Sequence, residues 1–162
     1  MLPGSRLAVE RPGPYPVGRM DLPFKRLRPE AVLPGYAKPG DAGMDLTSNV
    51  DVVVGPGERA LIPTGVAVAI PEGFAGLVLP RSGLASRHGL TLANAPGLID
   101  SGYRGEITCA VANLDREAPV EIRSGDRIAQ LLIVPVLNVD PVWVEVLPES
   151  ERGERGFGST GM

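Results

Sequence analysis

A ten-residue stretch that begins at Asn94 combines an amide, a carboxylate and an aromatic ring. Asn94 can both donate to and accept from the edge of a base, as can the main chain at 97–99. Asp100 follows two apolar residues and is a candidate general base. Tyr103 is one of three tyrosines, and its flat ring could cover the face of a sugar. Taken alone, the stretch fits an Asp-Ser-Gly turn with a packing tyrosine about equally well.

A second group, suited to phosphate, is formed by Arg81, Ser82 and Gly83. A strand is predicted to end at Pro80 and a short helix to follow, so backbone N–H groups are exposed at the junction. Gly83 would let a ligand approach closely, while a guanidinium and a hydroxyl both bind phosphate oxygens. A helix cap with a solvated arginine explains the same residues about as well.

Two more segments carry single polar residues of interest. Asp45 lies in a glycine-punctuated segment, 40–46, where a carboxylate could hold the water shell of Mg²⁺. A turn with acidic caps is the simpler interpretation of that segment. Gln130 interrupts the apolar run 128–136, and a buried amide there would need hydrogen-bond partners. A glutamine on the solvated face of a strand is the commoner case.

The last segment, 148–162, is polar, charged and rich in glycine. Such a composition predicts a disordered tail. Its small residues, hydroxyls and backbone amides could nevertheless wrap phosphates, and Phe157 could stack on a base.

Short β-strands separated by turns are predicted to position these groups. The chain of 162 residues contains 21 Gly and 17 Pro, which favours an all-β domain with many turns. Strand-like runs at roughly 8–12-residue spacing are typical of a sandwich or barrel. The predicted strands are 22–27, 52–54, 60–62, 65–70, 74–79, 90–94, 106–113, 120–122, 128–136 and 142–146, with about one helical turn at 84–87. Three parts are expected: a flexible Pro/Gly-rich extension (1–21), a β core (22–147) and a mobile tail (148–162).

Composition excludes several classes of protein. A formal net charge of −3 argues against a nonspecific nucleic-acid binder. One Cys (Cys109) and one His (His88) cannot form a disulfide framework or a Cys/His zinc site within one chain. No run of about 18 apolar residues is present, so no membrane partner is expected. Without an apolar signal core at the N-terminus, a cytoplasmic protein is the default expectation.

Taken in chain order, the five segments (40–46, 80–85, 94–105, 123–132 and 152–161) resemble the five motifs of the homotrimeric dUTPase family. The resemblance extends from about Leu22 to Gly161. It implies a jelly-roll-like β fold (a β-clip) and a homotrimer with active sites between subunits. It also implies hydrolysis of dUTP to dUMP and pyrophosphate with Mg²⁺, which limits uracil incorporation into DNA and supplies dUMP for thymidylate synthesis.

The resemblance assigns a role to each motif. Asp100 would orient and deprotonate the attacking water, Tyr103 would pack on the deoxyribose, and Asp45 would touch the water shell of the metal. Uracil would be read by Asn94 and by the main chain of Gly97, Leu98 and Ile99. Phosphates would be bound by Arg81, Ser82, Gly83 and Gln130. A tail from a neighbouring subunit would close over the nucleotide with Arg152, Phe157, Gly158, Ser159 and Thr160.

Two rival interpretations stay open at this point. A dCTP deaminase would share the fold and a hairpin similar to the one expected at 94–105. That family, however, places a catalytic Glu where this chain has Ala110. A non-enzymatic β-sandwich module would explain the strands but not the five motifs together. One departure from the dUTPase pattern is Arg155, which stands in the tail where glycine is usual.

Overall fold

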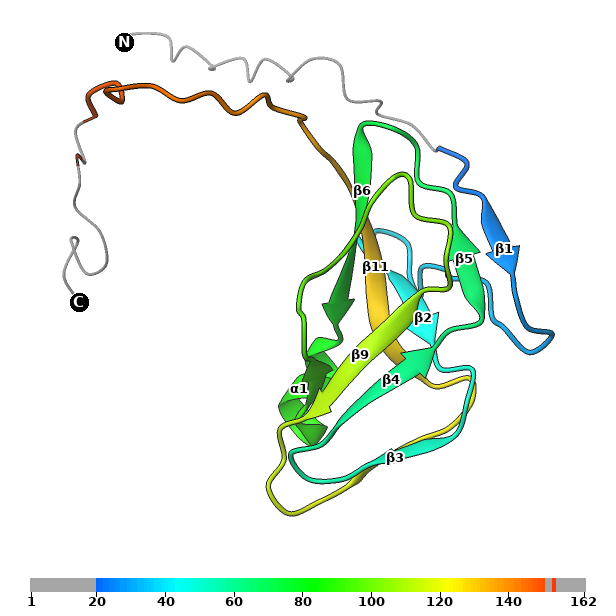
Figure 1. Ribbon diagram of the computed structural model, residues 1–162. Coiled ribbons are helices and arrows are strands. Elements are labelled where there is room, and N and C mark those ends of the chain that lie inside the picture. Colours follow the sequence, from blue (N-terminus) through cyan, green and yellow to red (C-terminus); the bar gives the residue numbers. More distant parts are fainter. Residues whose placement is uncertain (1–19, 151–152, 154–162) are drawn as a thin grey trace, which may run out of the picture.

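The computed structural model describes residues 20–150 and Gly153, and within them the regular secondary structure is almost entirely β-strand (Figure 1). The expected all-β architecture with one short helix is confirmed. The elements are β1 (Phe24–Arg26), β2 (Met44–Thr47), β3 (Val52–Val54), β4 (Arg59–Pro63), β5 (Val66–Val68), β6 (Phe74–Pro80), α1 (Ser82–His88), β7 (Leu90–Leu92), β8 (Gly97–Ile99), β9 (Thr108–Asn113), β10 (Val120–Ile122) and β11 (Arg127–Pro135).

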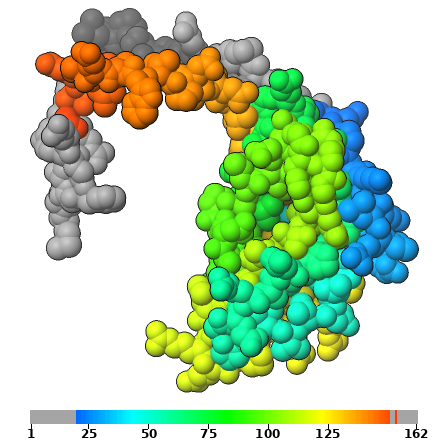
Figure 2. Space-filling model, in the orientation of Figure 1, coloured from blue at the N-terminus to red at the C-terminus, as the bar shows by residue number. Residues whose placement is uncertain are grey.

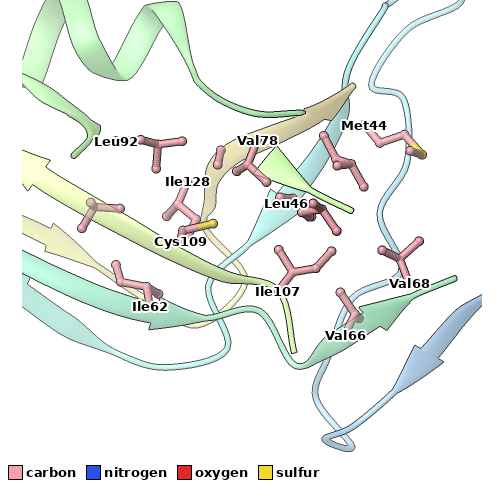
Figure 3. Packing of buried hydrophobic residues seen from close by; sticks show 14 of the residues in the cluster. Met44, Leu46, Ile62, Val66, Val68, Val78, Leu92, Ile107, Cys109 and Ile128 are labelled. Carbon is pink, nitrogen blue, oxygen red and sulfur yellow. The ribbon is translucent and has the colours of Figure 1, made fainter. Parts of the chain in front are cut away.

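Antiparallel sheets of four and three strands enclose the core. Their strand orders are β2-β11-β6-β8 and β4-β9-β7, and two further pairs, β1-β5 and β10-β3, complete the body. β11 is the longest strand and pairs with both β2 and β6. Side chains from both sheets meet in a common interior, where Figure 3 shows Met44, Leu46, Val78, Ile128, Ile62 and Cys109 among others.

Strand alternation decides which polar side chains leave this interior. Met44 and Leu46 of β2 are buried, so Asp45 between them points to the outer face of the four-stranded sheet. On β11, Ala129 and Leu131 are fully buried and Gln130 lies between them on the same outer face. Because Gln130 pairs with Asp45 in the register of β11 and β2, the two polar side chains are brought together.

The sequence did not predict β2, because 40–46 was interpreted as a turn. In the four residues of β2, apolar and polar side chains alternate over too short a length to predict a strand. Met44–Thr47 forms a strand because the long neighbouring strand β11 supplies its hydrogen-bond partners. Helix α1, by contrast, extends the predicted helical turn and ends at His88; it is capped by Gly89, whose φ of 64° places it in the left-handed region.

The predicted strand 142–146 is wrong. Residues 136–150, here called the arm, leave the end of β11 and carry no strand or helix (Figure 2). The apolar pattern is present, and Val142, Trp143 and Val144 are exposed. A strand needs a partner for its backbone N–H and C=O groups, and the arm stands away from the body of the chain.

The helix content of the described region is limited to α1, and no helix there is long and apolar enough to cross a membrane.

Candidate active site

A cavity of about 190 Å³ opens between the four-stranded and three-stranded sheets at the edge formed by β8. We call it the nucleoside pocket. Its lining combines apolar side chains of β6, β7 and β9 with the polar stretch predicted from the sequence. The lining residues are Val78, Leu92, Asn94, Gly97, Leu98, Ile99, Asp100, Tyr103, Glu106, Ile107, Thr108, Cys109 and Ala110.

All six residues predicted to contact the base and sugar, or to activate water, are in this lining. Asn94, Asp100 and Tyr103 are exposed, whereas Gly97 and Ile99 are buried. The polar groups therefore stand at the mouth of a cavity whose inner wall is apolar, an arrangement typical of small-molecule sites.

The hairpin β7–β8 places the base-reading groups. After β7, the Ala95–Pro96 peptide is cis and the chain returns as β8, where Gly97 pairs with Val78. A Cβ on Gly97 would lie 3.3 Å from Asn94 Nδ2 and 3.4 Å from Val78 Cβ. Glycine at this position therefore keeps the Asn94 amide close to the main chain of β8 without a clash.

A second cavity, of about 260 Å³, lies on the outer face of the four-stranded sheet. We call it the arginine pocket. It gathers every described residue that was predicted to bind phosphate or the metal's water shell, from three separate motifs. Its lining residues are Ala37, Asp41, Ala42, Gly43, Asp45, Arg81, Ser82, Gly83, Arg127 and Gln130.

Asp45 lies between two arginines in this pocket. Its Oδ1 is 3.2 Å from Arg81 Nε and its Oδ2 is 3.0 Å from Arg127 Nη1. Arg81 also donates to the backbone carbonyl of Arg127 at 3.0 Å. The two arginines are balanced by Asp45 and by the exposed Asp41 of the same lining, so an anion would be bound by the guanidinium N–H donors rather than by a net positive charge. The carboxylate of Asp45 keeps both guanidinium groups in place.

Arg127 lines this pocket, although no sequence pattern predicts a role for it. Along a regular strand, Arg127 and Gln130 would face opposite sides, because they are three residues apart. A bulge between Arg127 and Ala129 inserts one residue against β2 and resets the alternation. Both side chains therefore reach the same pocket, and a bulge of this kind leaves no clear mark in the sequence.

Gln130 is fixed on the floor of the arginine pocket. Its Nε2 donates to the Pro80 carbonyl at 3.0 Å. A Cβ on Gly43 would approach Gln130 Oε1 to 2.8 Å, so only glycine leaves room for the amide. Gln130 is half-buried on the outer face of the sheet, so it is held by a backbone partner without being part of the core.

The nucleoside pocket also contains residues that the sequence patterns do not single out as site residues. Cys109 is one of them; its side chain is 1% exposed, and burial raises the pKa of its thiol to about 12. Glu106 and Thr108 follow Tyr103 closely, and their position next to a candidate site was the only available signal.

The two pockets lie on different sides of β6 and share no lining residue. One flank of β6 pairs with β8 of the nucleoside pocket, and the other pairs with β11 of the arginine pocket. Within one chain, the predicted base-binding and phosphate-binding residues are thus not united in a single cavity. The predicted tail residues Arg152, Phe157, Gly158, Ser159 and Thr160 lie outside the described residues.

The family model for dUTPase matches residues 29–161. The chain belongs to the dUTPase family. The predicted family resemblance and the jelly-roll-like β fold are both confirmed.

Curated relatives agree with the family model. The chain is 57% identical over 142 residues to a deoxyuridine 5'-triphosphate nucleotidohydrolase of Leifsonia xyli, with 88% of this chain and 91% of the relative covered. It is 57% identical over 134 residues to the protein of the same description from Cutibacterium acnes, with 83% and 88% covered.

Solved structures of phage dUTPases share the fold. A variant of the Staphylococcus bacteriophage 80alpha dUTPase with dUpNHpp is 35% identical, has a TM-score of 0.82, and is matched over 88% of this chain and 99% of its own. A dUTPase variant from phage phi11 of S. aureus is 32% identical with a TM-score of 0.74, over 78% and 98% of the chains, and coordinates a structural Mg(II) ion.

Proposed function

We propose that this member of the dUTPase family hydrolyses dUTP to dUMP and pyrophosphate, with the nucleoside pocket holding the base and sugar. The observation that carries the proposal is the lining of that pocket, where Asn94, Asp100 and Tyr103 surround one cavity of about 190 Å³. A base reader, a carboxylate and an aromatic ring are the groups that a nucleotide hydrolase of this kind needs.

Each group has a distinct part in the proposed reaction. The Asn94 amide and the main chain of Gly97–Ile99 hydrogen-bond to uracil, and the size of the hairpin excludes a thymine methyl. Tyr103 packs on the deoxyribose and leaves no room for a 2'-hydroxyl. Asp100 contacts the 3'-hydroxyl and orients and deprotonates the water that attacks the α-phosphate.

The arginine pocket is proposed to bind the triphosphate. Arg81 and the hydroxyl of Ser82 donate to phosphate oxygens, and Gly83 allows the chain to approach them. Gln130 adds an amide donor on the pocket floor, where Pro80 already orients it. When the triphosphate enters, the guanidinium groups exchange part of their contact with Asp45 for the more highly charged phosphates.

The arginine pocket also fits Mg²⁺, but only as a partner of the substrate. Asp45 is already balanced by two arginines and Asp41 is the one other carboxylate in the lining, so these two groups cannot supply a full ligand set for the ion. Asp45 would instead hold water molecules of an ion bound mainly by the phosphates. The ion would supply charge stabilisation at the phosphates as the water attacks.

A homotrimer would bring together the nucleoside pocket and the arginine pocket, which are separate within one chain. Two pockets without shared lining residues are compatible with sites that form between subunits, one pocket from each of two chains. The arm supports association as well, because Leu137, Val142 and Trp143 are 86%, 78% and 103% exposed. Buried on a neighbouring subunit, these side chains would no longer face water.

The predicted mobile tail is proposed to complete the site from a neighbouring subunit, with Arg152 and Phe157 over phosphate and base. The domain limits 1–21, 22–147 and 148–162 stay predictions, as does a cytoplasmic location. In the cell, the reaction would lower dUTP, limit uracil in DNA and supply dUMP.

A dCTP deaminase is disfavoured by Ala110, which lines the nucleoside pocket in place of the expected glutamate. A methyl group cannot transfer the protons that deamination requires. Cytosine would therefore lack its acid/base partner in this cavity.

Incubation with dUTP, dCTP and Mg²⁺ separates these functions. We expect pyrophosphate from dUTP and no ammonia from either nucleotide. Ammonia from dCTP would favour the deaminase, and the absence of both products would favour a binding module.

A further inference from the structure

We propose that Glu106 is a positioning residue for the sugar side of the nucleoside pocket, because its side chain anchors the peptide that holds Tyr103 in place. The inference rests on the proposed role of Tyr103 at the deoxyribose. Glu106 itself lines the pocket, but its carboxylate accepts a hydrogen bond from the β4–β5 turn. The proposed reaction assigns it no contact with the nucleotide.

Tyr103 is folded back onto its own loop. Its hydroxyl donates to the backbone carbonyl of Glu106 at 3.0 Å, and its backbone N–H donates to the Asp100 carbonyl at 3.0 Å. A Cβ on Gly105 would lie 2.6 Å from Tyr103 Cζ, so glycine is required for the ring to lie there. The position of the ring therefore depends on where the carbonyl of Glu106 is held.

The side chain of Glu106 ties that peptide to the β4–β5 turn. Glu106 Oε1 accepts the backbone N–H of Gly65 at 2.7 Å. Gly65 has a φ of 74°, and a Cβ there would lie 2.6 Å from Ala31 Cβ and 2.9 Å from Asn49 Oδ1. Gly65 thus packs closely against Ala31 and Asn49, and this packing limits how far the turn can move away from the carboxylate.

Neighbouring hydrogen bonds hold the other side of the same peptide. Ile107 N–H donates to the Val66 carbonyl at 2.8 Å, and the Thr64 hydroxyl donates to the Ile107 carbonyl at 2.6 Å. The Ile107 N–H belongs to the same planar peptide as the Glu106 carbonyl, so its bond to Val66 also holds that carbonyl. The bond from Gly65 is the restraint that depends on the Glu106 side chain, and it orients the residue whose carbonyl accepts the hydrogen bond from Tyr103.

The length of the Glu106 side chain, rather than its charge, is the property that the hydrogen bond with Gly65 requires. Its contact with Arg28 is long, with 3.7 Å between Nε and Oε1, and half of the Arg28 side chain is exposed. An exposed pair of this kind contributes little. A neutral acceptor of the same length should therefore replace the carboxylate, whereas a shorter carboxylate should not.

Three substitutions separate these properties. Glu106→Gln keeps an acceptor at the right length, Glu106→Asp keeps the charge but shortens the side chain, and Glu121→Ala removes an exposed carboxylate on β10 as a control. For each variant, kcat and KM are measured with dUTP and with UTP in the presence of Mg²⁺, together with the thermal midpoint.

We expect Glu106→Asp to lose about 10-fold or more of the dUTP-over-UTP preference in kcat/KM, because a displaced Tyr103 no longer blocks the 2'-hydroxyl. The ratio for Glu106→Gln should stay close to that of the unaltered chain and of the Glu121→Ala control. An unchanged ratio in Glu106→Asp, or an equal loss in both Glu106 variants, would overturn the inference.

Tyr103→Ala distinguishes this inference from the function on which it rests. If Tyr103→Ala leaves the dUTP-over-UTP ratio unchanged, the proposed role of Tyr103 fails, and the inference fails with it. If Tyr103→Ala lowers the ratio while Glu106→Asp does not, only the role of Glu106 is refuted.

Discussion

At the residue scale, the charges around Asp45 bear on how an acidic protein would receive a triphosphate in the proposed complex. Its carboxylate is 3.0–3.2 Å from the nearest nitrogens of Arg81 and Arg127. Without substrate, Asp45 is paired with both arginines. In the proposed complex, the phosphates would be better partners for the arginines, and Asp45 would be free to hold metal-bound water.

Cys109 offers a direct test of the packing beneath the nucleoside pocket. Burial raises the pKa of its thiol from an ordinary value of 9.0 to about 12, so the fold favours the protonated form. At pH 8 the folded protein should react negligibly with iodoacetamide, while the urea-unfolded chain should react rapidly at its single cysteine. Mass spectrometry distinguishes the two, and rapid labelling of the folded protein would contradict this packing.

The same shift sets a dependence of stability on pH. Because the folded pKa is raised, the contribution of Cys109 is fully present below pH 9 and is lost as pH rises from about 9 to 12.

Individual residues also show what the sequence could and could not predict at this scale. Asp100, Asn94 and Tyr103 were found because polar and aromatic groups stood out between turn signals, and all three line the nucleoside pocket. Arg127 was missed because strand alternation directs it away from Gln130, and only the bulge reverses this. Glu106 was missed because its partner, Gly65, is 41 residues distant in the chain.

At the scale of elements, the four-stranded sheet connects the two pockets through β6. Gly76 lies in the middle of β6, opposite Ile99 of β8 and Ile133 of β11. A Cβ there would lie 2.8 Å from Ile70 Cδ1 and 3.0 Å from Leu131 Cδ1. The core has no space for a methyl group at this point.

We therefore expect Gly76→Ala to lower the free energy of unfolding by about 1–3 kcal/mol, the usual cost of overpacking a core. Urea denaturation followed by circular dichroism measures it. Gly35→Ala is the matched control, because no atom lies within 4 Å of an added Cβ there. Equal stability of the two variants would show that the core around β6 is looser than described.

The elements that sequence patterns located well are those with an apolar run of their own, such as β6 and β11. Two errors have a common cause in tertiary context. The pattern of 40–46 indicates a turn although β11 makes Met44–Thr47 a strand, and the pattern of 142–146 predicts a strand although no strand among the described residues pairs with it. Local alternation states which residues could form a strand, whereas pairing decides which ones do.

At the scale of the whole molecule, the exposed apolar side chains of the arm have no packing partner in the described part of a single chain. Trp143 is the only tryptophan of the protein and its side chain is fully exposed in the single chain. In the proposed homotrimer it would pack on a neighbouring subunit, where buried aromatic residues contribute strongly to association.

We expect a native mass of three times 17.0 kDa by light scattering. Trp143→Ala should weaken association by about 2 kcal/mol or more, as truncation of a buried interface aromatic does. Sedimentation velocity over a dilution series measures this, with Leu114→Ala, an exposed apolar residue outside the arm, as the control. A monomer at all concentrations would rule out sites shared between subunits.

The most direct test of the account is the turnover of Asp100→Asn with dUTP and Mg²⁺, measured as pyrophosphate release. The substitution preserves shape but removes the group proposed to accept the proton of the attacking water. We predict a kcat lower by about 10²–10⁴-fold, with binding of an uncleavable dUTP analogue retained. Asp51→Asn, which alters an exposed carboxylate outside both pockets, should keep normal turnover. A near-normal kcat in Asp100→Asn would contradict the proposed mechanism.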